Sequence, residues 1–101
     1  MTINSQLSDS KDSVLISVDG RFDFSSHRDF REAYESYGTE IKRYEIDMAK
    51  TVYLDSSALG MLLLLRDYAG GNDATIRIVN CSEAVRNIFS ISNFEQLFEI
   101  S

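Results

Sequence analysis

The chain has 101 residues, of which 44% are apolar and 26% are charged, and its formal net charge is −6. This length suits one compact domain spanning residues 1–101 and leaves no room for a second. The 10 Lys and Arg residues are scattered singly, whereas nucleic-acid binding usually requires a basic patch, so the composition argues against DNA or RNA as a direct partner.

Neither a membrane nor a metal is indicated. Residues 1–10 lack the basic and apolar regions of a secretory signal. The longest apolar run, residues 61–65, is far shorter than the ~20 residues that span a bilayer. We therefore expect a cytoplasmic protein without direct membrane insertion. The single His27 and the single Cys81 offer no paired ligand spacing, so we expect no metal and no cofactor, and Cys81 fits a small buried hydrophobe.

The first part of the chain predicts two strands and a helix. Residues 2–7 alternate apolar and polar side chains as an edge strand does, and residues 13–18 form a β-rich run that ends at the turn signal Asp19-Gly20. A helix follows, which the serine at position 25 or 26 can cap and which ends at Gly38. Its apolar residues recur at helical spacing: Phe30, Ala33, Tyr34 and Tyr37.

The middle of the chain predicts a strand over residues 44–49, from which Val52 and Leu54 lead into Asp55-Ser56-Ser57. The pattern of residues 57–69 is helical. Gly70-Gly71 follows this helix and is interpreted as its C-terminal cap. It is not interpreted as a phosphate-binding loop, because such a loop precedes a helix.

The last part predicts a strand over residues 75–79, a helix capped by Ser82, and a short strand over residues 97–100. The complete order is β-β-α-β-α-β-α-β. Alternating strands and helices predict an α/β domain with a mixed, mostly parallel sheet of about four or five strands and about three helices.

Sites in such folds commonly lie at strand-to-helix loops, and two loops compete here, residues 20–26 and residues 50–60. In the second loop, Asp55 or Ser56 can act simply as a helix N-cap, because its oxygen accepts a hydrogen bond from the first turn. A phosphate on Ser56 would instead lie at the positive end of the helix dipole, which tolerates it without refolding. It would add nearly two negative charges, so its main effect would fall on a docking partner.

The helix after Ser56 carries a wide apolar arc. One side must pack on the sheet, and it consists of Ala58, Leu62, Leu65 and Ala69. Gly60 and Asp67 face the opposite way, while Leu59 and Leu63 lie on one flank and Leu64 and Tyr68 on the other. The flanking side chains are either exposed near Ser56, as a patch for protein docking, or covered completely by neighbouring helices.

Three segments, in this order along the chain, resemble one known family. They are Gly20-Arg21-Phe22-Asp23, the hexapeptide Asp55-Ser56-Ser57-Ala58-Leu59-Gly60, and residues 82–89 followed by Ile91-Ser92 and Phe94. Together they resemble the STAS-domain anti-sigma factor antagonists, also called anti-anti-sigma factors, and the resemblance covers nearly the whole chain. It implies a single STAS domain.

The resemblance also implies a function. In that family the unphosphorylated domain binds a kinase-type anti-sigma factor or regulatory protein. That serine kinase uses ATP to phosphorylate the first serine of the motif, here Ser56, with Ser57 as the alternative, and a serine phosphatase removes the phosphate. The chain would then be a substrate and binding module without catalytic residues of its own. The implied partner-binding residues are Asp23, Asp55, Ser56, Ser57, Leu59, Gly60 and Leu63.

The sequence departs from the family pattern at two places. Ala58 stands where glycine is frequent, a change that the first turn of a helix accepts easily. Many members carry a further C-terminal helix, whereas this sequence ends about where the last strand should end. We expect the surface there to be smaller or to be covered by a partner.

Two other functions compete with the switch. One is a structural STAS scaffold, a subunit of a signalling or membrane transport complex without a sigma-factor target. The other is a serine hydrolase that uses Ser56 or Ser57. The Gly-x-Ser-x-Gly elbow is missing and only His27 could serve as a general base, so the sequence argues against hydrolysis.

Overall fold

The computed structural model of the chain describes residues 2–38 and 40–101. The strands are β1 (Thr2–Leu7), β2 (Ser13–Phe22), β3 (Arg43–Asp47), β4 (Thr51–Leu54), β5 (Ile76–Val79) and β6 (Glu99–Ile100). The α-helices are α1 (His27–Glu35), α2 (Ser56–Tyr68) and α3 (Glu83–Ile91). Short 3-10 turns η1 (Phe24–Ser26), η2 (Gly71–Asp73) and η3 (Phe94–Gln96) complete the order.

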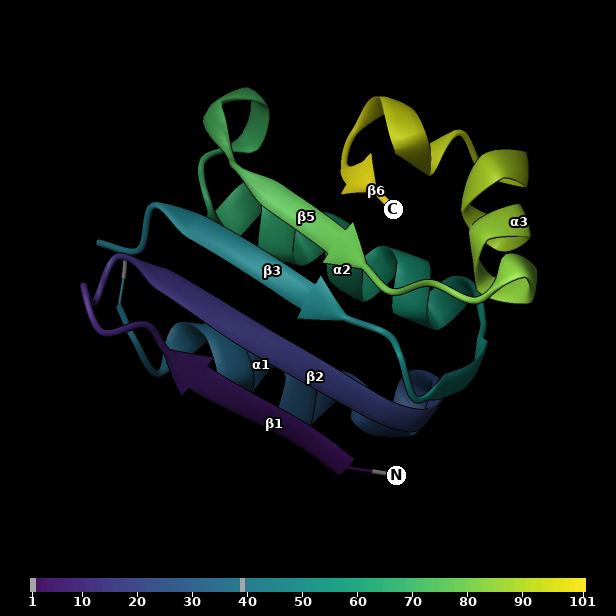
Figure 1. Cartoon of the computed structure of the whole chain (residues 1–101), viewed down its shortest axis with the longest axis horizontal. Helices are drawn as coiled ribbons and strands as arrows, with labels where there is room; N and C mark the ends of the chain where they lie inside the picture. The colour runs from purple at the N-terminus through teal and green to yellow at the C-terminus, as the bar shows by residue number, and fades with distance from the viewer. Residues whose placement is uncertain (1, 39) are drawn as a thin grey trace.

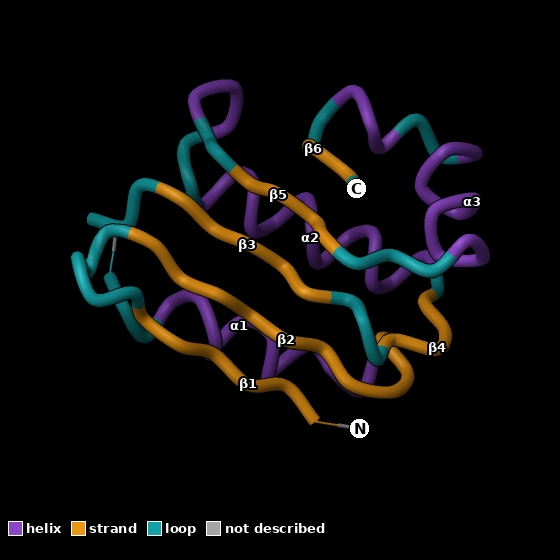
Figure 2. Tube along the Cα trace, in the orientation of Figure 1, coloured by secondary structure: helices purple, strands orange, loops and turns teal. Residues whose placement is uncertain are grey.

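The strands form one mixed sheet with the order β1-β2-β3-β5-β6, and β4 also pairs with β2. Only β1 runs antiparallel to its neighbour, while the other described pairings are parallel. Helices α1 and α2 lie behind the sheet, and α3 lies beyond the end of β5 (Figures 1 and 2). The predicted α/β class and mostly parallel sheet are confirmed, although the described residues form six strands where the sequence suggested four or five.

The additional strand arises because β2 is longer than predicted. β2 pairs with β3 through residues 13–17 and with β4 through residues 20–22. The predicted end of β2 at Asp19-Gly20 is therefore wrong. Gly20 adopts a φ of 91° and donates its N–H to the carbonyl of Lys50 at 2.8 Å, so the strand bends there and continues. Glycine takes this left-handed conformation without a steric penalty.

A β-bulge sets the direction of the side chains in β4. Gly20 is paired with Thr51 and Arg21 with Tyr53, so Val52 is an extra residue opposite β2. The usual alternation of inward and outward side chains is broken, and both Val52 and Tyr53 are exposed. Thr51 is buried, and its hydroxyl donates to the carbonyl of Val18 at 2.6 Å. The bulge thus places two outward-facing apolar residues directly before α2.

The core lies between the helices and one face of the sheet. Alternate residues of β2 point into it, and aromatic rings connect the elements, with the centroids of Phe89 and Phe94 5.9 Å apart and those of Phe94 and Phe98 5.6 Å apart. Cys81, predicted to be buried, is half-buried against this core, and desolvation raises the pKa of its thiol. The fully buried large side chains are Phe22, Phe30, Phe89, Ile16, Ile46, Met48, Leu62, Leu65, Ile78, Val14, Val18 and Val85.

The helix ends follow the sequence with some differences. Ser82 caps α3 as predicted, because its hydroxyl accepts the N–H of Val85 at 3.2 Å. Gly70, with a φ of 119°, follows the end of α2 as predicted. Helix α1 ends at Glu35, before the predicted Gly38, and the last strand is shortened to Glu99–Ile100 because η3 precedes it.

Candidate functional site

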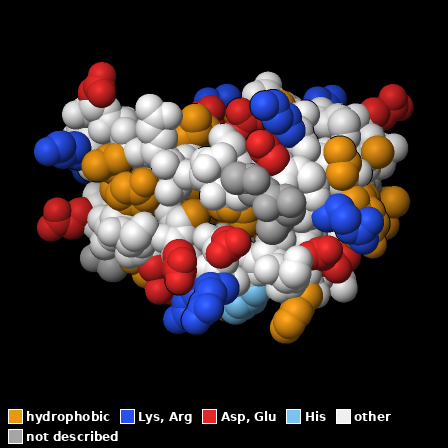
Figure 3. All heavy atoms as spheres, turned by 90° about the horizontal axis from the view of Figure 1, so that it is seen from below, with side chains coloured by type: hydrophobic (Ala, Val, Ile, Leu, Met, Phe, Trp, Pro, Cys, Tyr) orange, Lys and Arg blue, Asp and Glu red, His pale blue; other side chains and the backbone are white. Residues whose placement is uncertain are grey.

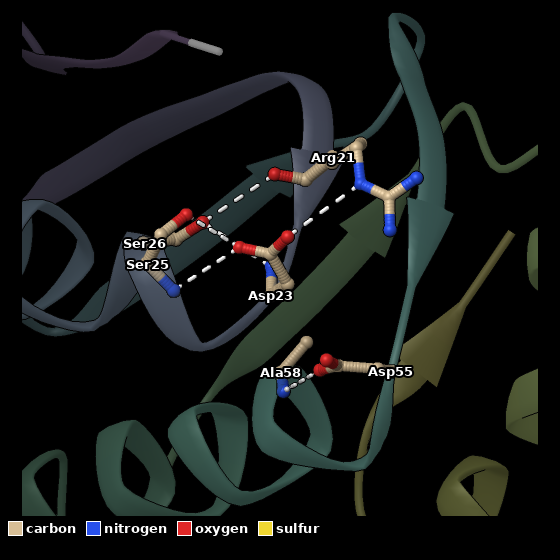
Figure 4. A network of polar contacts seen from close by, with 6 residues as sticks. All are labelled: Arg21, Asp23, Ser25, Ser26, Asp55 and Ala58. Atoms are coloured by element: carbon tan, nitrogen blue, oxygen red, sulfur yellow. Dashed lines mark hydrogen bonds and ion pairs between the residues drawn. The ribbon is translucent and has the colours of Figure 1, made fainter.

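The register between β2 and β4 brings the two aspartates of the predicted site together. These parallel strands pair Phe22 with Leu54, and each of these residues is followed by an aspartate. The N–H of Asp55 donates to the carbonyl of Phe22 at 3.3 Å. Asp23 and Asp55 therefore both lie at the C-terminal ends of these strands, beside the first turn of α2 (Figure 4). The two loops that competed in the sequence therefore lie side by side and form one candidate site.

Asp23 is held in place by its own loop. Its carboxylate accepts hydrogen bonds from the hydroxyl of Ser25 at 2.5 Å and from the N–H of Ser25 at 3.1 Å, while Arg21 lies 3.6 Å away as an ion-pair partner. The Ser25 hydroxyl, assisted by Arg21, lowers the pKa of Asp23 below its usual value. The N–H of Asp23 donates to the hydroxyl oxygen of Ser26 at 3.2 Å, which completes a capping box.

The cap in this loop differs from the prediction that Ser25 or Ser26 caps the helix. Ser26 occupies the N-cap position of α1, but its side chain makes no capping hydrogen bond to that helix. The Ser25 hydroxyl does not cap α1 either, because it donates to the carboxylate of Asp23. Asp23 caps the preceding turn η1 instead. The loop before α1 is thus ordered around the Asp23 carboxylate, which points toward Ser25 and Arg21 (Figure 4).

Asp55, and not Ser56, is the N-cap of α2. Its carboxylate accepts the N–H of Ala58 at 3.1 Å. Ser56 is consequently free of the capping role, is exposed at the first position of the helix, and its hydroxyl makes no hydrogen bond with another described residue. Ser57 is half-buried. The helix start is stabilised by one residue, which leaves the neighbouring hydroxyl available for chemistry.

The sequence left open whether the side chains that flank the buried side of α2 are exposed or covered, and the structure shows two of them exposed. The flanking residues Leu63 and Leu64 keep 39% and 51% of their surface exposed, whereas Leu59 and Tyr68 are partly buried against the core. The predicted buried side is confirmed, with Ala58, Leu62 and Leu65 fully buried, Ala69 partly buried, and Met61 buried in addition. Gly60 and Asp67 are exposed, as predicted.

Several exposed residues near this site were not predicted. Phe24 is 73% exposed and stacks on His27, with 6.3 Å between the ring centroids. The guanidinium of Arg21 lies 4.5 Å from the centroid of the Tyr53 ring, and Val52 is 74% exposed. Phe24 and Arg21 belong to a loop that the sequence had marked. Val52 and Tyr53 face outward because of the bulge, which local alternation of residue types does not reveal.

Metal-ligand clusters and membrane-spanning helices are both absent from the described part of the chain. Among the described residues, no group of three or more His, Cys, Asp and Glu side chains could hold a metal ion. Within the same part of the chain, none of the helices has the length and apolar character needed to cross a membrane. The imidazole of His27, the candidate general base, stacks on the ring of Phe24.

The sequence matches the family model described as "Mlab, STAS domain" over residues 5–99. The chain belongs to the STAS-domain family. A STAS-domain containing protein of Pseudomonas aeruginosa (strain UCBPP-PA14) is 59% identical over 88 residues, which is 87% of each chain.

Solved structures share the fold of this STAS domain. A putative anti-sigma factor antagonist from Thermotoga maritima superposes with a TM-score of 0.82 at 14% identity, covering 97% of this chain and 84% of that one. The Bacillus cell fate determinant SpoIIAA in its phosphorylated form superposes with a TM-score of 0.74 at 15% identity, covering 99% and 91%. At these identities the likeness concerns the fold alone, which is SpoIIAA-like.

Proposed function

We propose that this STAS domain is an anti-sigma factor antagonist that acts as a phosphorylation-controlled binding switch. Its unphosphorylated form binds a kinase-type anti-sigma or regulatory protein, phosphorylation of Ser56 releases that partner, and a serine phosphatase restores binding. One observation carries the proposal: Asp55 caps α2, so the exposed Ser56 hydroxyl is free at the helix start.

The geometry favours Ser56 over Ser57 as the phosphate acceptor. A kinase must reach the hydroxyl, and Ser56 is exposed while Ser57 is half-buried. A phosphate on Ser56 would lie at the N-terminus of the 13-residue helix α2, where free N–H groups and the helix dipole stabilise negative charge. It would also lie next to Asp55 on a chain whose net charge is already −6. The phosphorylated state would therefore differ from the free state mainly in surface charge.

The surface around Ser56 has the composition of a protein-binding site. Phe24, Tyr53 and Leu63 expose apolar surface, and Arg21 and Asp23 supply charges. Aromatic residues and arginine are enriched where protein interfaces concentrate their binding energy. These residues extend the predicted set of Asp23, Asp55, Ser56, Ser57, Leu59, Gly60 and Leu63.

Gly60 gives independent support. Glycine inside a helix costs up to about 1 kcal/mol relative to alanine. Nothing in the described part of the chain lies within 4 Å of a Cβ built at Gly60, so internal packing does not require glycine there. A partner that approaches the backbone of α2 closely would require it.

A kinase assay tests the proposed function directly. Incubation with ATP and the cognate serine kinase should label the wild type and Ser57→Ala, and should leave Ser56→Ala unlabelled, because Ser56 is exposed whereas Ser57 is half-buried. The labelled site is read by mass spectrometry. Labelling of Ser57 alone would contradict the assignment of Ser56 and make Ser57 the phosphate acceptor. If neither serine were labelled and the Ser56 variants bound the partner normally, the structural scaffold function would replace the switch.

Gly60→Ala should separate stability from binding. The added methyl group meets open space in the free chain, so the free energy of unfolding should rise by roughly 0.4–1 kcal/mol. Binding to the partner should become weaker, because the methyl group occupies space at the interface. Chemical denaturation and calorimetric titration measure the two effects. Asp67→Ala, at another exposed position of α2, is the control and should leave binding unchanged.

A further inference from the structure

The outer edge of β1 is an open sheet edge. β1 is the last strand of the sheet, and Figures 1 and 2 show no other element of residues 2–38 and 40–101 beyond it. Figure 3 views the molecule from this side. The ladder to β2 is regular, from the pair Leu7 and Val14 to the pair Thr2 and Asp19, without a bulge. The backbone groups on the far side of β1 are therefore arranged to accept another strand.

The ladder identifies which groups these are. Ser8 donates its N–H to the carbonyl of Ser13 at 2.9 Å, so these two residues form a hydrogen-bonded pair. Antiparallel pairing alternates along the strand, so Gln6 and Asn4 also point their backbone groups toward β2. The N–H and C=O groups of Ile3, Ser5 and Leu7 then point away from the sheet.

This edge lacks the features that normally prevent strand addition. Native edges are blunted by charged residues, proline, bulges or very short strands. Residues 2–7 contain no charged residue and no proline, although the whole chain carries a net charge of −6. The opposite edge is different, since β6 has two residues and its Glu99 is exposed and paired with Arg77.

We propose that the β1 edge binds a second copy of this chain, with the two β1 strands antiparallel about a two-fold axis at Ser5. In this register Ser5 faces Ser5 and Ile3 faces Leu7, so each outward N–H and C=O meets a partner. Ile3 and Leu7 already pack partly against the core, and each would gain an apolar neighbour from the other copy. The two sheets would join into one.

Symmetry and charge favour a second copy over another partner. The outward groups are placed symmetrically about Ser5, which a two-fold contact requires. An acidic chain repels its own copies over most of its surface, but β1 offers an uncharged strip. A single pair of six-residue strands makes a small interface, so we expect a dissociation constant on the order of 0.1 mM.

Concentration-dependent measurements on the purified chain test the proposal. Sedimentation velocity should show a monomer in the low micromolar range and a dimer near 1 mM, about ten times the expected dissociation constant. NMR over the same range should show the amide signals of Ile3, Ser5 and Leu7 shifting more than those of Asn4 and Gln6. The shift pattern distinguishes the β1 edge from any other contact.

Two matched double variants decide the register. Asn4 and Gln6 are exposed on the other face of β1 and would face each other across the axis. Asn4→Lys with Gln6→Lys places like charges opposite one another and should weaken the dimer at least tenfold. It should do so even though the two lysines make the chain less negative, which by itself would lessen the repulsion between copies. Asn4→Lys with Gln6→Glu places opposite charges there and should retain the dimer. A monomer at 1 mM, as expected if the edge serves a peptide of another protein, would overturn the proposal. So would a dimer that both variants leave equally strong.

Discussion

Replacing Phe22 with alanine should lower the free energy of unfolding by about 3–5 kcal/mol. Phe22 is fully buried at the end of β2, and its ring centroid lies 5.0 Å from that of Phe30 on α1. Alanine would remove this contact and leave a cavity between the sheet and the helix. Domains of this size have a total stability of roughly 5–15 kcal/mol, so the loss would be a large fraction of it. Urea denaturation measures it as a lower midpoint with an unchanged slope.

Phe24→Ala is the matched control, two residues further along the chain. The same atoms are removed, but Phe24 is 73% exposed. We expect the free energy of unfolding to change by no more than about 0.5 kcal/mol. Partner binding should nevertheless weaken, because Phe24 belongs to the proposed docking surface. Equal destabilisation by the two substitutions would show that the packing around Phe22 differs from the one described.

Ser56→Glu should weaken partner binding by roughly 10- to 100-fold. The glutamate would place a negative charge beside Asp55, at the centre of the proposed docking surface, where a partner must exclude water. The fold should not change, because the N-terminus of α2 accepts an acidic side chain favourably. Calorimetric titration with the purified partner measures the affinity, and Ser56→Ala should bind at least as tightly as the wild type in the presence of ATP.

The control for this charge is Ser90→Glu. Ser90 is exposed on α3, so the substitution changes the net charge equally at a place outside the proposed docking surface. Its binding should equal that of the wild type at physiological ionic strength. If Ser56→Glu and Ser90→Glu weakened binding to the same extent, overall repulsion and not a local switch would be responsible.

Local sequence patterns were sufficient for much of the fold. The capping role of Ser82, the end of α2 before Gly70 and the buried side of α2 all follow from interactions within a few residues along the chain. The alternation of strands and helices likewise indicated a mostly parallel sheet, which the structure confirms. Such features depend on short-range periodicity, which a sequence displays directly.

Features that depend on pairing between distant segments were missed. The continuation of β2 through Gly20 requires the carbonyl of Lys50, and the exposure of Val52 requires the register with β2. Asp23, Ser25 and Ser26 are all good capping residues, so local sequence could not select among them. The union of the two candidate loops also arises only from the pairing of Phe22 with Leu54.

The division of roles between Asp55 and Ser56 has a consequence for timing. Because the Asp55 carboxylate caps α2, we expect the helix to begin at the same residue whether or not Ser56 carries a phosphate. Under the proposed function, such a switch would need no slow structural relaxation, so its response would be as fast as the kinase and phosphatase that act on it. The relative activities of those two enzymes, and not a property of this chain, would then set the lifetimes of the phosphorylated and unphosphorylated states.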